Sequence, residues 1–199
     1  MILYGASGHA KVIIDILLKN NVEVSRILDD NPKNMEIFNI PVEKAFLSEE
    51  DSSEKMIISI GSNEIRKSVS EKYTFDYQTA IHPTAVISDF SKIGEGTVVM
   101  ANAVINSSSE IGKHCIINTS AVVEHECKIS DFVHISPNAS LAGNVEVGEG
   151  THIGIGACVI QGVKIGKWAI VGAGAVIIRD VPDFATVVGN PGRIIKIKE

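Results

Sequence analysis

The sequence has few aromatic residues and no long apolar run. Only 5% of its 199 residues are aromatic although 45% are hydrophobic, which indicates a core of valine, isoleucine and alanine. No apolar run of about eighteen residues occurs, so no membrane-spanning helix is expected. The net charge of −6 gives a nucleic-acid-binding role no global electrostatic support.

Cysteine is also scarce, and none of the three cysteines has the spacing of a metal site. Cys115 and Cys127 fall on small, inward positions of the repeat described below, so we interpret them as core residues. Because the sequence opens with a strand-like segment, no signal peptide is expected. These features together predict a protein of the reducing cytoplasm.

What the sequence contains instead is a repeat of six residues from about residue 81 to residue 177. The second residue of each hexad is aliphatic and the last is small or short, without insertion. A short strand plus a turn generates this period, whereas a helix or a plain strand does not. The repeat therefore predicts a parallel β-helix with three hexads in each triangular coil of eighteen residues. The aliphatic positions are Ile81, Ile87, Ile93, Val99, Ile105, Ile111, Ile117, Val123, Ile129, Ile135, Leu141, Val147, Ile153, Val159, Ile165, Val171 and Ile177.

Residues 1–80 have a different pattern, which predicts a small Rossmann-like α/β domain. Strands are expected at residues 2–4, 25–28 and 56–60, and helices at about 10–20 and from the Gly61 turn to about 72. Residues 37–42 form a short strand or a loop, and residues 48–55 form a loop or a helical turn. At this length the domain is about half of a dinucleotide-binding fold.

The hexads end at Pro182, where the regular pattern stops. We therefore divide the chain into a Rossmann-like α/β domain at 1–80, a β-helix at 81–181 and a C-terminal cap at 182–199. The predicted fold class is mainly β.

Five features of the sequence carry a resemblance to a known family. The hexads and the ending VVGNPGRIIK resemble the hexapeptide-repeat acyltransferases, which form left-handed β-helices. The segments YGASGHAK, LDD and IGSNEIRK, placed before the hexads, resemble sugar acetyltransferases of the bacillosamine pathway, with sialic acid O-acetyltransferases close behind. The resemblance implies acetyl-CoA as the acetyl donor and no metal. It also implies a UDP-linked amino sugar as the acceptor and a cytoplasmic homotrimer with interfacial active sites.

The polar triplet at residues 124–126 is unusual within an otherwise apolar coil. Acetyl transfer to an amine needs a base and a donor for the tetrahedral oxyanion. By resemblance His125 is the catalytic base and Glu126 orients it. Gly143 lies eighteen residues beyond His125, so the two should occupy the same corner on successive coils.

The resemblance implies the acetyl-CoA site as well. The Gly143 amide holds the thioester carbonyl, Asn118 assists, and His134 contacts the acetyl end. His134 should stack on His152, which we interpret as structural, like His82 and His114. Exposed small residues at corners allow the pantetheine to lie against backbone; the members of this set are Ala142, Gly143 and Gly172.

The candidate nucleotide-sugar site lies in the α/β domain. Residues 5–9 join a strand to a helix N-terminus, where backbone N–H groups and the helix dipole favour phosphate. Asp29 is placed to accept from a ribose hydroxyl or a uracil N–H, and a second glycine turn at residue 61 flanks the same crevice. The complete set is Gly5, Ser7, Gly8, His9, Asp29, Asp30, Gly61, Asn63 and Arg66.

By the resemblance, these residues line the nucleotide-sugar pocket, and the chain is expected to transfer an acetyl group directly to the 4-amino group of a nucleotide-linked sugar. Three alternatives stay open at this point: O-acetylation of sialic acid or another sugar, a non-catalytic β-helix scaffold, and a nucleotide-sensing module. The six histidines lack the clustering of a metal site.

Overall fold

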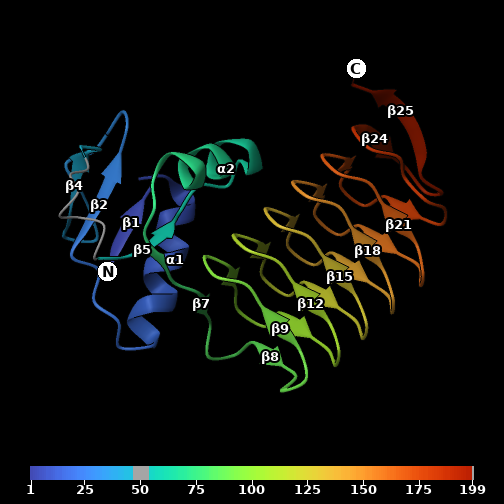
Figure 1. Cartoon of the computed structure of the whole chain (residues 1–199), viewed down its shortest axis with the longest axis horizontal. Coiled ribbons are helices and arrows are strands. Elements are labelled where there is room, and N and C mark those ends of the chain that lie inside the picture. The colour runs from blue at the N-terminus through green and yellow to red at the C-terminus, as the bar shows by residue number, and fades with distance from the viewer. Residues whose placement is uncertain (47–53, 199) are drawn as a thin grey trace.

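The computed structural model describes residues 1–46 and 54–198. An N-terminal α/β part is followed by a long parallel β-helix, which ends in a short hairpin (Figure 1). This arrangement confirms the predicted fold class. Of the expected loop at 48–55, residues 48–53 lie outside the described residues. No helix within the described ranges is long and apolar enough to cross a membrane.

The α/β part is built on one mostly parallel sheet with the strand order β3-β4-β2-β1-β5-β6. Its central strand β1 is completely buried, because helices cover both faces of a parallel sheet. The sequence predicted a short strand or a loop at residues 37–42. These residues belong to an antiparallel hairpin formed by β3 and β4. The elements are β1 (Ile2–Tyr4), α1 (Gly8–Lys19), β2 (Arg26–Asp29), β3 (Glu36–Ile37), β4 (Ile40–Lys44), β5 (Lys55–Ile58), α2 (Asn63–Lys72) and β6 (Asp76–Tyr77).

The β-helix has three faces made of two-residue strands. The docking face, which meets the α/β part, contains β7 (Ala80–Ile81), β10 (Val98–Val99), β13 (Ile116–Ile117), β16 (His134–Ile135), β19 (His152–Ile153) and β22 (Ile170–Val171). The second face contains β8 (Val86–Ile87), β11 (Val104–Ile105), β14 (Val122–Val123), β17 (Ser140–Leu141), β20 (Cys158–Val159) and β23 (Val176–Ile177). The third face contains β9 (Lys92–Ile93), β12 (Glu110–Ile111), β15 (Lys128–Ile129), β18 (Glu146–Val147) and β21 (Lys164–Ile165).

The interior of the β-helix follows the hexad pattern. The aliphatic positions from Val99 to Ile177 are at most 3% exposed, and the small positions Cys115 and Cys127 are fully buried. Each strand pairs in parallel with the strand eighteen residues further on, for example Ile116 with His134 and His134 with His152. The expected register is therefore confirmed. Since the prism is narrow, small residues at the corners are what allow the chain to turn.

The fifth residue of most hexads has a left-handed backbone, which the sequence reading did not anticipate. From residue 96 to residue 174 this position has a φ between 52° and 72°. Glycine, asparagine and serine fill most of these positions because they tolerate that conformation. Four others do not fit that preference: His114, Glu126, Phe132 and Trp168.

The last coil is closed by β24 (Ala185–Val188) and β25 (Arg193–Ile197), which pair with each other antiparallel. β24 also pairs in parallel with β22, so the hairpin extends the docking face. Ala185 and Val187 are buried against the last coil.

Two sets of contacts join the α/β part to the β-helix. Apolar side chains of α1 share one buried cluster with Val98, Met100 and Ile116 of the docking face. The helix α2 contacts the proximal corner, which we define as the turns between the third face and the docking face (residues 112–115, 130–133, 148–151 and 166–169). The opposite edge, between the second and third faces, is the distal corner (residues 106–109, 124–127 and 142–145).

Candidate active site

His125 and Glu126 lie on the distal corner between β14 and β15. Their side chains are 59% and 65% exposed, and His125 Nδ1 lies 3.0 Å from Glu126 Oε2. An ionised carboxylate can only accept a hydrogen bond, so the neutral ring carries its proton on Nδ1. Nε2 then keeps a free lone pair, which is the arrangement that a general base needs.

Gly143 occupies the same corner one coil further along, as the spacing predicted. A Cβ atom on residue 143 would lie 2.5 Å from His125 Cε1 and 2.6 Å from His125 Nε2. The imidazole therefore occupies the space that a side chain at 143 would need. Ala142 lies beside it, and its carbonyl oxygen is 3.3 Å from the Cys127 Sγ atom.

Asn118, which directly follows β13, and His134 of β16 form a second polar group at the edge of the docking face. The Thr119 N–H donates to Asn118 Oδ1 at 2.8 Å, which fixes the orientation of the amide. Asn118 Nδ2 consequently faces His134 Nε2 at 3.0 Å and donates to it, so the proton of His134 is on Nδ1. Burial is the main cause that lowers the pKa of His134 to about 3, and His152 and Arg66 lower it further. His134 is therefore neutral at physiological pH.

His152 repeats this arrangement one coil later. Its ring stacks on His134 with centroids 4.7 Å apart, and its Nε2 lies 2.7 Å from Ser136 Oγ. The stacking was predicted, whereas the role of Ser136 was missed. The common spacing of sixteen residues in Asn118–His134 and Ser136–His152 is the signal in the sequence that could have revealed it.

The N-terminus of α1 has the features of an anion site. The Ser7 hydroxyl makes no capping hydrogen bond, whereas the Ser62 hydroxyl at the start of α2 accepts from the Ile65 N–H. A side chain added at Gly8 would meet no atom within 4 Å, so this end of the helix is open. Gly5 has a φ of 112°, and a Cβ there would lie 2.5 Å from Ile60.

His9 is the second residue of α1 and lies near enough to Arg66 and His134 to interact with both electrostatically. Burial, with help from the Arg66 charge, lowers the pKa of His9 to about 4. Its Nε2 atom is buried and has no hydrogen-bond partner among the described residues.

Asp29, the last residue of β2, and Asp30 after it already accept hydrogen bonds from neighbouring residues. Asp29 accepts from the Ala6 N–H at 2.7 Å and from the Asn31 N–H at 2.8 Å. Asp30 accepts from the Tyr4 hydroxyl at 2.9 Å. Both carboxylates lie at the carboxyl edge of the sheet, beside the start of α1.

Gly61 borders a cleft of about 470 Å³ between α2 and the β-helix. Its other walls include His152 and Trp168; the sequence reading had not singled out Trp168. Asn63 also lines this cleft, although it is only 5% exposed and its Nδ2 donates to the Gly150 and Thr151 carbonyls. The expectation for Arg66 needs correction: its side chain is 1% exposed and donates to protein oxygens, so it does not line the cleft.

Gly172 is likewise covered rather than open. A Cβ at this position would lie 2.7 Å from the Val188 side chain, because β24 pairs along the docking face beside it. The expected exposed small residue is thus partly sheltered by the C-terminal hairpin.

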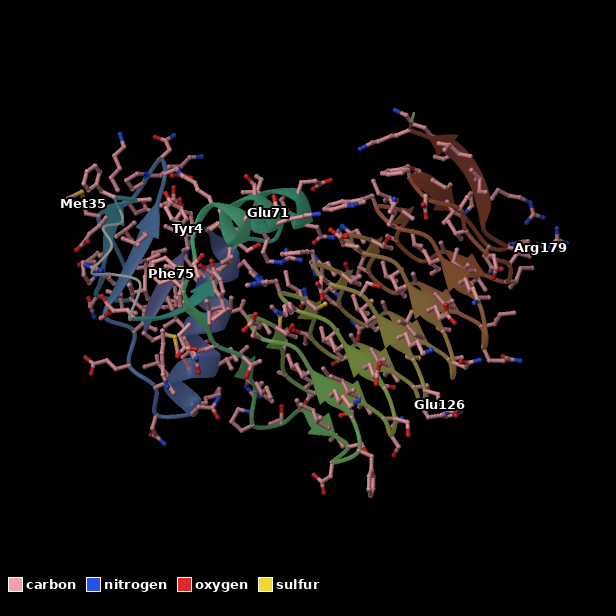
Figure 2. All side chains as sticks on the ribbon, viewed as in Figure 1. Tyr4, Met35, Glu71, Phe75, Glu126 and Arg179 are labelled. Carbon is pink, nitrogen blue, oxygen red and sulfur yellow. The ribbon has the colours of Figure 1, made fainter. Side chains whose placement is uncertain are left out.

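The predicted site residues therefore form two groups on opposite sides of one chain. His125, Glu126, Ala142 and Gly143 lie on the distal corner, whereas Asn118 and His134 lie on the docking face near α1 and α2. Figure 2 shows Glu126 at the edge of the β-helix away from Tyr4 and the rest of the α/β part. Within one chain Asn118 does not assist at His125, because it belongs to a different face. No group of three or more His, Cys, Asp or Glu in residues 1–46 and 54–198 could hold a metal ion.

Comparisons with known proteins match both parts of the chain. Residues 1–73 match the PglD N-terminal domain, and residues 90–125 and 144–179 match the bacterial transferase hexapeptide repeats. Perosamine N-acetyltransferase from Caulobacter crescentus, in a variant solved with CoA and GDP-perosamine, is 39% identical with a TM-score of 0.94. The match covers 98% of this chain and 96% of that protein. The chain belongs to the hexapeptide-repeat sugar acetyltransferases.

Two further members of these sugar acetyltransferases show the range of relatives. The acetyltransferase domain of PglB from Neisseria gonorrhoeae, solved with acetyl coenzyme A, is 36% identical with a TM-score of 0.90, and the match covers 98% of both chains. UDP-N-acetylbacillosamine N-acetyltransferase from Bacillus subtilis is 43% identical over 108 residues. That alignment spans half of this chain and half the length of the relative.

Proposed function

We propose that the protein transfers an acetyl group from acetyl-CoA to the amine of a nucleotide-linked amino sugar. The observation that carries the proposal is the His125–Glu126 pair, whose free Nε2 lies beside the backbone of Gly143. A base next to an approachable amide is what attack of an amine on a thioester requires. The bound molecules named for the Caulobacter and Neisseria relatives support the same pair of substrates.

The proposed reaction needs no covalent enzyme intermediate. The amine nitrogen attacks the thioester carbonyl carbon, and its proton passes to His125 Nε2. The Gly143 N–H donates to the carbonyl oxygen as negative charge develops on it. The C–S bond then breaks, and the CoA thiolate leaves and takes up a proton. Glu126 stabilises the charged imidazolium through Nδ1.

For the acceptor we propose a UDP-linked 4-amino-4,6-dideoxy sugar. The open N-terminus of α1 offers backbone N–H groups and a helix dipole to a diphosphate. The Bacillus relative is named for a UDP sugar, whereas the Caulobacter relative was solved with a GDP sugar. The base therefore has to be tested directly.

The test is a thiol-release assay with acetyl-CoA and a set of acceptors. Turnover should be fastest with the UDP-linked amino sugar, slower with its GDP counterpart and absent with sialic acid or CMP-sialic acid. The His125→Ala variant should lose about a hundredfold or more in kcat, the usual effect of removing a general base. Turnover of sialic acid alone would replace the proposed acceptor. An unchanged rate in the variant would instead remove His125 from the mechanism.

We further propose a homotrimer in which each site is shared between neighbouring chains. The support is the separation of the two groups: the base lies on the distal corner, and the nucleotide-sugar residues lie beside the docking face. A neighbouring copy that places its distal corner against the docking face would complete the site. A cytoplasmic location is proposed with it, because acetyl-CoA is supplied there.

Complementation between two inactive variants tests the shared site. His125→Ala removes the base, and Gly8→Glu puts a negative charge into open space at the start of α1. If the site is shared, randomly mixed trimers contain intact sites, and about a quarter of the wild-type activity should return. If each chain builds its own site, the mixture stays inactive, which would overturn the proposal.

A further inference from the structure

The buried Arg66 side chain, which belongs to α2, contacts both the proximal corner of the β-helix and the Gly61 turn through its planar guanidinium group. Its Nε donates to the His114 carbonyl at 2.7 Å, and its Nη2 donates to the Phe132 carbonyl at 2.9 Å. Its Nη1 donates to the carbonyls of Ile60 at 3.0 Å and Gly61 at 3.3 Å. The guanidinium therefore binds the proximal corner and the Gly61 turn at the same time.

Asn63 extends this contact to the next coil. Its Oδ1 accepts from Arg66 Nη2 at 2.8 Å, and its Nδ2 donates to the carbonyls of Gly150 at 3.0 Å and Thr151 at 3.3 Å. His114, Phe132 and Gly150 are spaced by eighteen residues, so they occupy one corner on three successive coils. Asn63 and Arg66 thus fix the position of α2 along the β-helix axis to within one coil. A shift of α2 along this axis would leave their buried donors without partners.

The place that this contact fixes is relevant to the proposed reaction. The Gly61 turn and His152 face each other across the same cleft, and Thr151, which accepts from Asn63, directly precedes His152. The His134 ring stacks on the His152 ring, so the two histidines lie side by side on the docking face. The distance between the α/β part and these histidines is consequently set by Asn63 and Arg66.

We infer that Asn63 and Arg66 are positioning residues that hold the nucleotide-sugar-binding edge of the α/β part at a fixed distance from the docking face. The inference rests on the proposed function for its kinetic test. Neither side chain touches the substrate. Both act by holding the Gly61 turn in place. Arginine is needed because its fixed, planar fork can serve separate oxygens at once, whereas a lysine ammonium has three donors at a single point.

The experiment compares Arg66→Met, Arg66→Lys and Asn63→Ala with the matched control Lys67→Met. Lys67 also reaches from α2 to the β-helix, through a partly buried ion pair with Glu149 and two aromatic rings, and none of these contacts involves the Gly61 turn. Arg66→Met should raise the KM for the nucleotide sugar by about tenfold or more while the KM for acetyl-CoA changes by less than about twofold. Arg66→Lys should fall between Arg66→Met and the wild type, and Lys67→Met should stay within about twofold for both substrates.

Hydrogen exchange provides a readout that does not depend on catalysis. In Arg66→Met, amides in the peptide that contains β5, the Gly61 turn and α2 should exchange faster, while amides inside the β-helix should keep their protection. If Arg66→Met does not fold, Asn63→Ala, which loses the bonds to Gly150, Thr151 and Arg66 Nη2 but keeps the Arg66 bonds to the proximal corner and the Gly61 turn, should show the same selective exchange and KM change to a smaller degree. A folded variant with unchanged exchange in this peptide would overturn the inference. A wild-type protein without acetyltransferase activity would overturn the proposed function alone.

Discussion

Replacing Gly143 by alanine should inactivate the enzyme through His125 without damaging the fold. The added Cβ would lie 2.5 Å from His125 Cε1, whereas ordinary contacts begin at 3.4 Å. The imidazole is exposed and held only at Nδ1, so it should move by about 1 Å rather than the backbone, and a displacement of this size costs about a hundredfold in rate. The Gly143 N–H is retained in this variant, so the oxyanion donor is not lost.

The assay is steady-state thiol release, together with the same substitution in the His125→Ala background. Alanine at position 143 should lower kcat by about a hundredfold in the wild type and cause little further loss where the imidazole is already absent. The melting temperature should stay close to that of the wild type, because the clash lies on the surface. If the two substitutions lower the rate additively, Gly143 does not act through His125 and the reasoning is refuted.

Two further predictions concern charge. Glu126→Gln should lower kcat by about tenfold with little change in KM, because the amide still accepts from Nδ1 but no longer stabilises the imidazolium; an unchanged kcat in the same assay would make Glu126 dispensable. Acidification from about pH 6.5 to about pH 4 should destabilise the fold. Burial lowers the pKa of His9 and His114 to about 4 and that of His134 to about 3, so the unfolded chain binds protons that the folded chain does not. For His114 alone the loss at pH 5 is about 2 kcal/mol relative to neutral pH. Urea unfolding at pH 7.5 and pH 5 should show this loss reduced in His114→Phe, and an equal loss in both proteins would contradict the assignment.

The six-residue repeat determined the β-helix and its register from the sequence alone. A period of six permits one arrangement in which aliphatic side chains fill a three-sided interior, so the stacking of Gly143 on His125 and of His152 on His134 follows from arithmetic. The α/β part was predicted to within about two residues at the ends of α1, β2 and β5, because buried apolar runs and glycine turns mark its elements.

The exceptions to the repeat were harder to interpret. His114, Phe132 and Trp168 occupy a left-handed turn position where small residues are preferred. They lie there because the proximal corner is packed against α2: His114 stacks on Phe132 at 5.3 Å, and Lys67 lies over the Phe132 and Trp168 rings. Nothing in the local sequence distinguishes this kind of exception from Glu126, which occupies the same hexad position but faces solvent.

Only the tertiary structure decided which side of the β-helix each polar residue faces relative to the α/β part. The hexad gives every residue a face and a coil, but the packing of α1 and α2 selects which face is covered. That packing made Arg66 a buried link between coils instead of an exposed side chain, and it put His134, rather than His125, beside the α/β part. The physical reason is that a triangular prism has three equivalent faces in its repeat, and long-range contacts alone make them different.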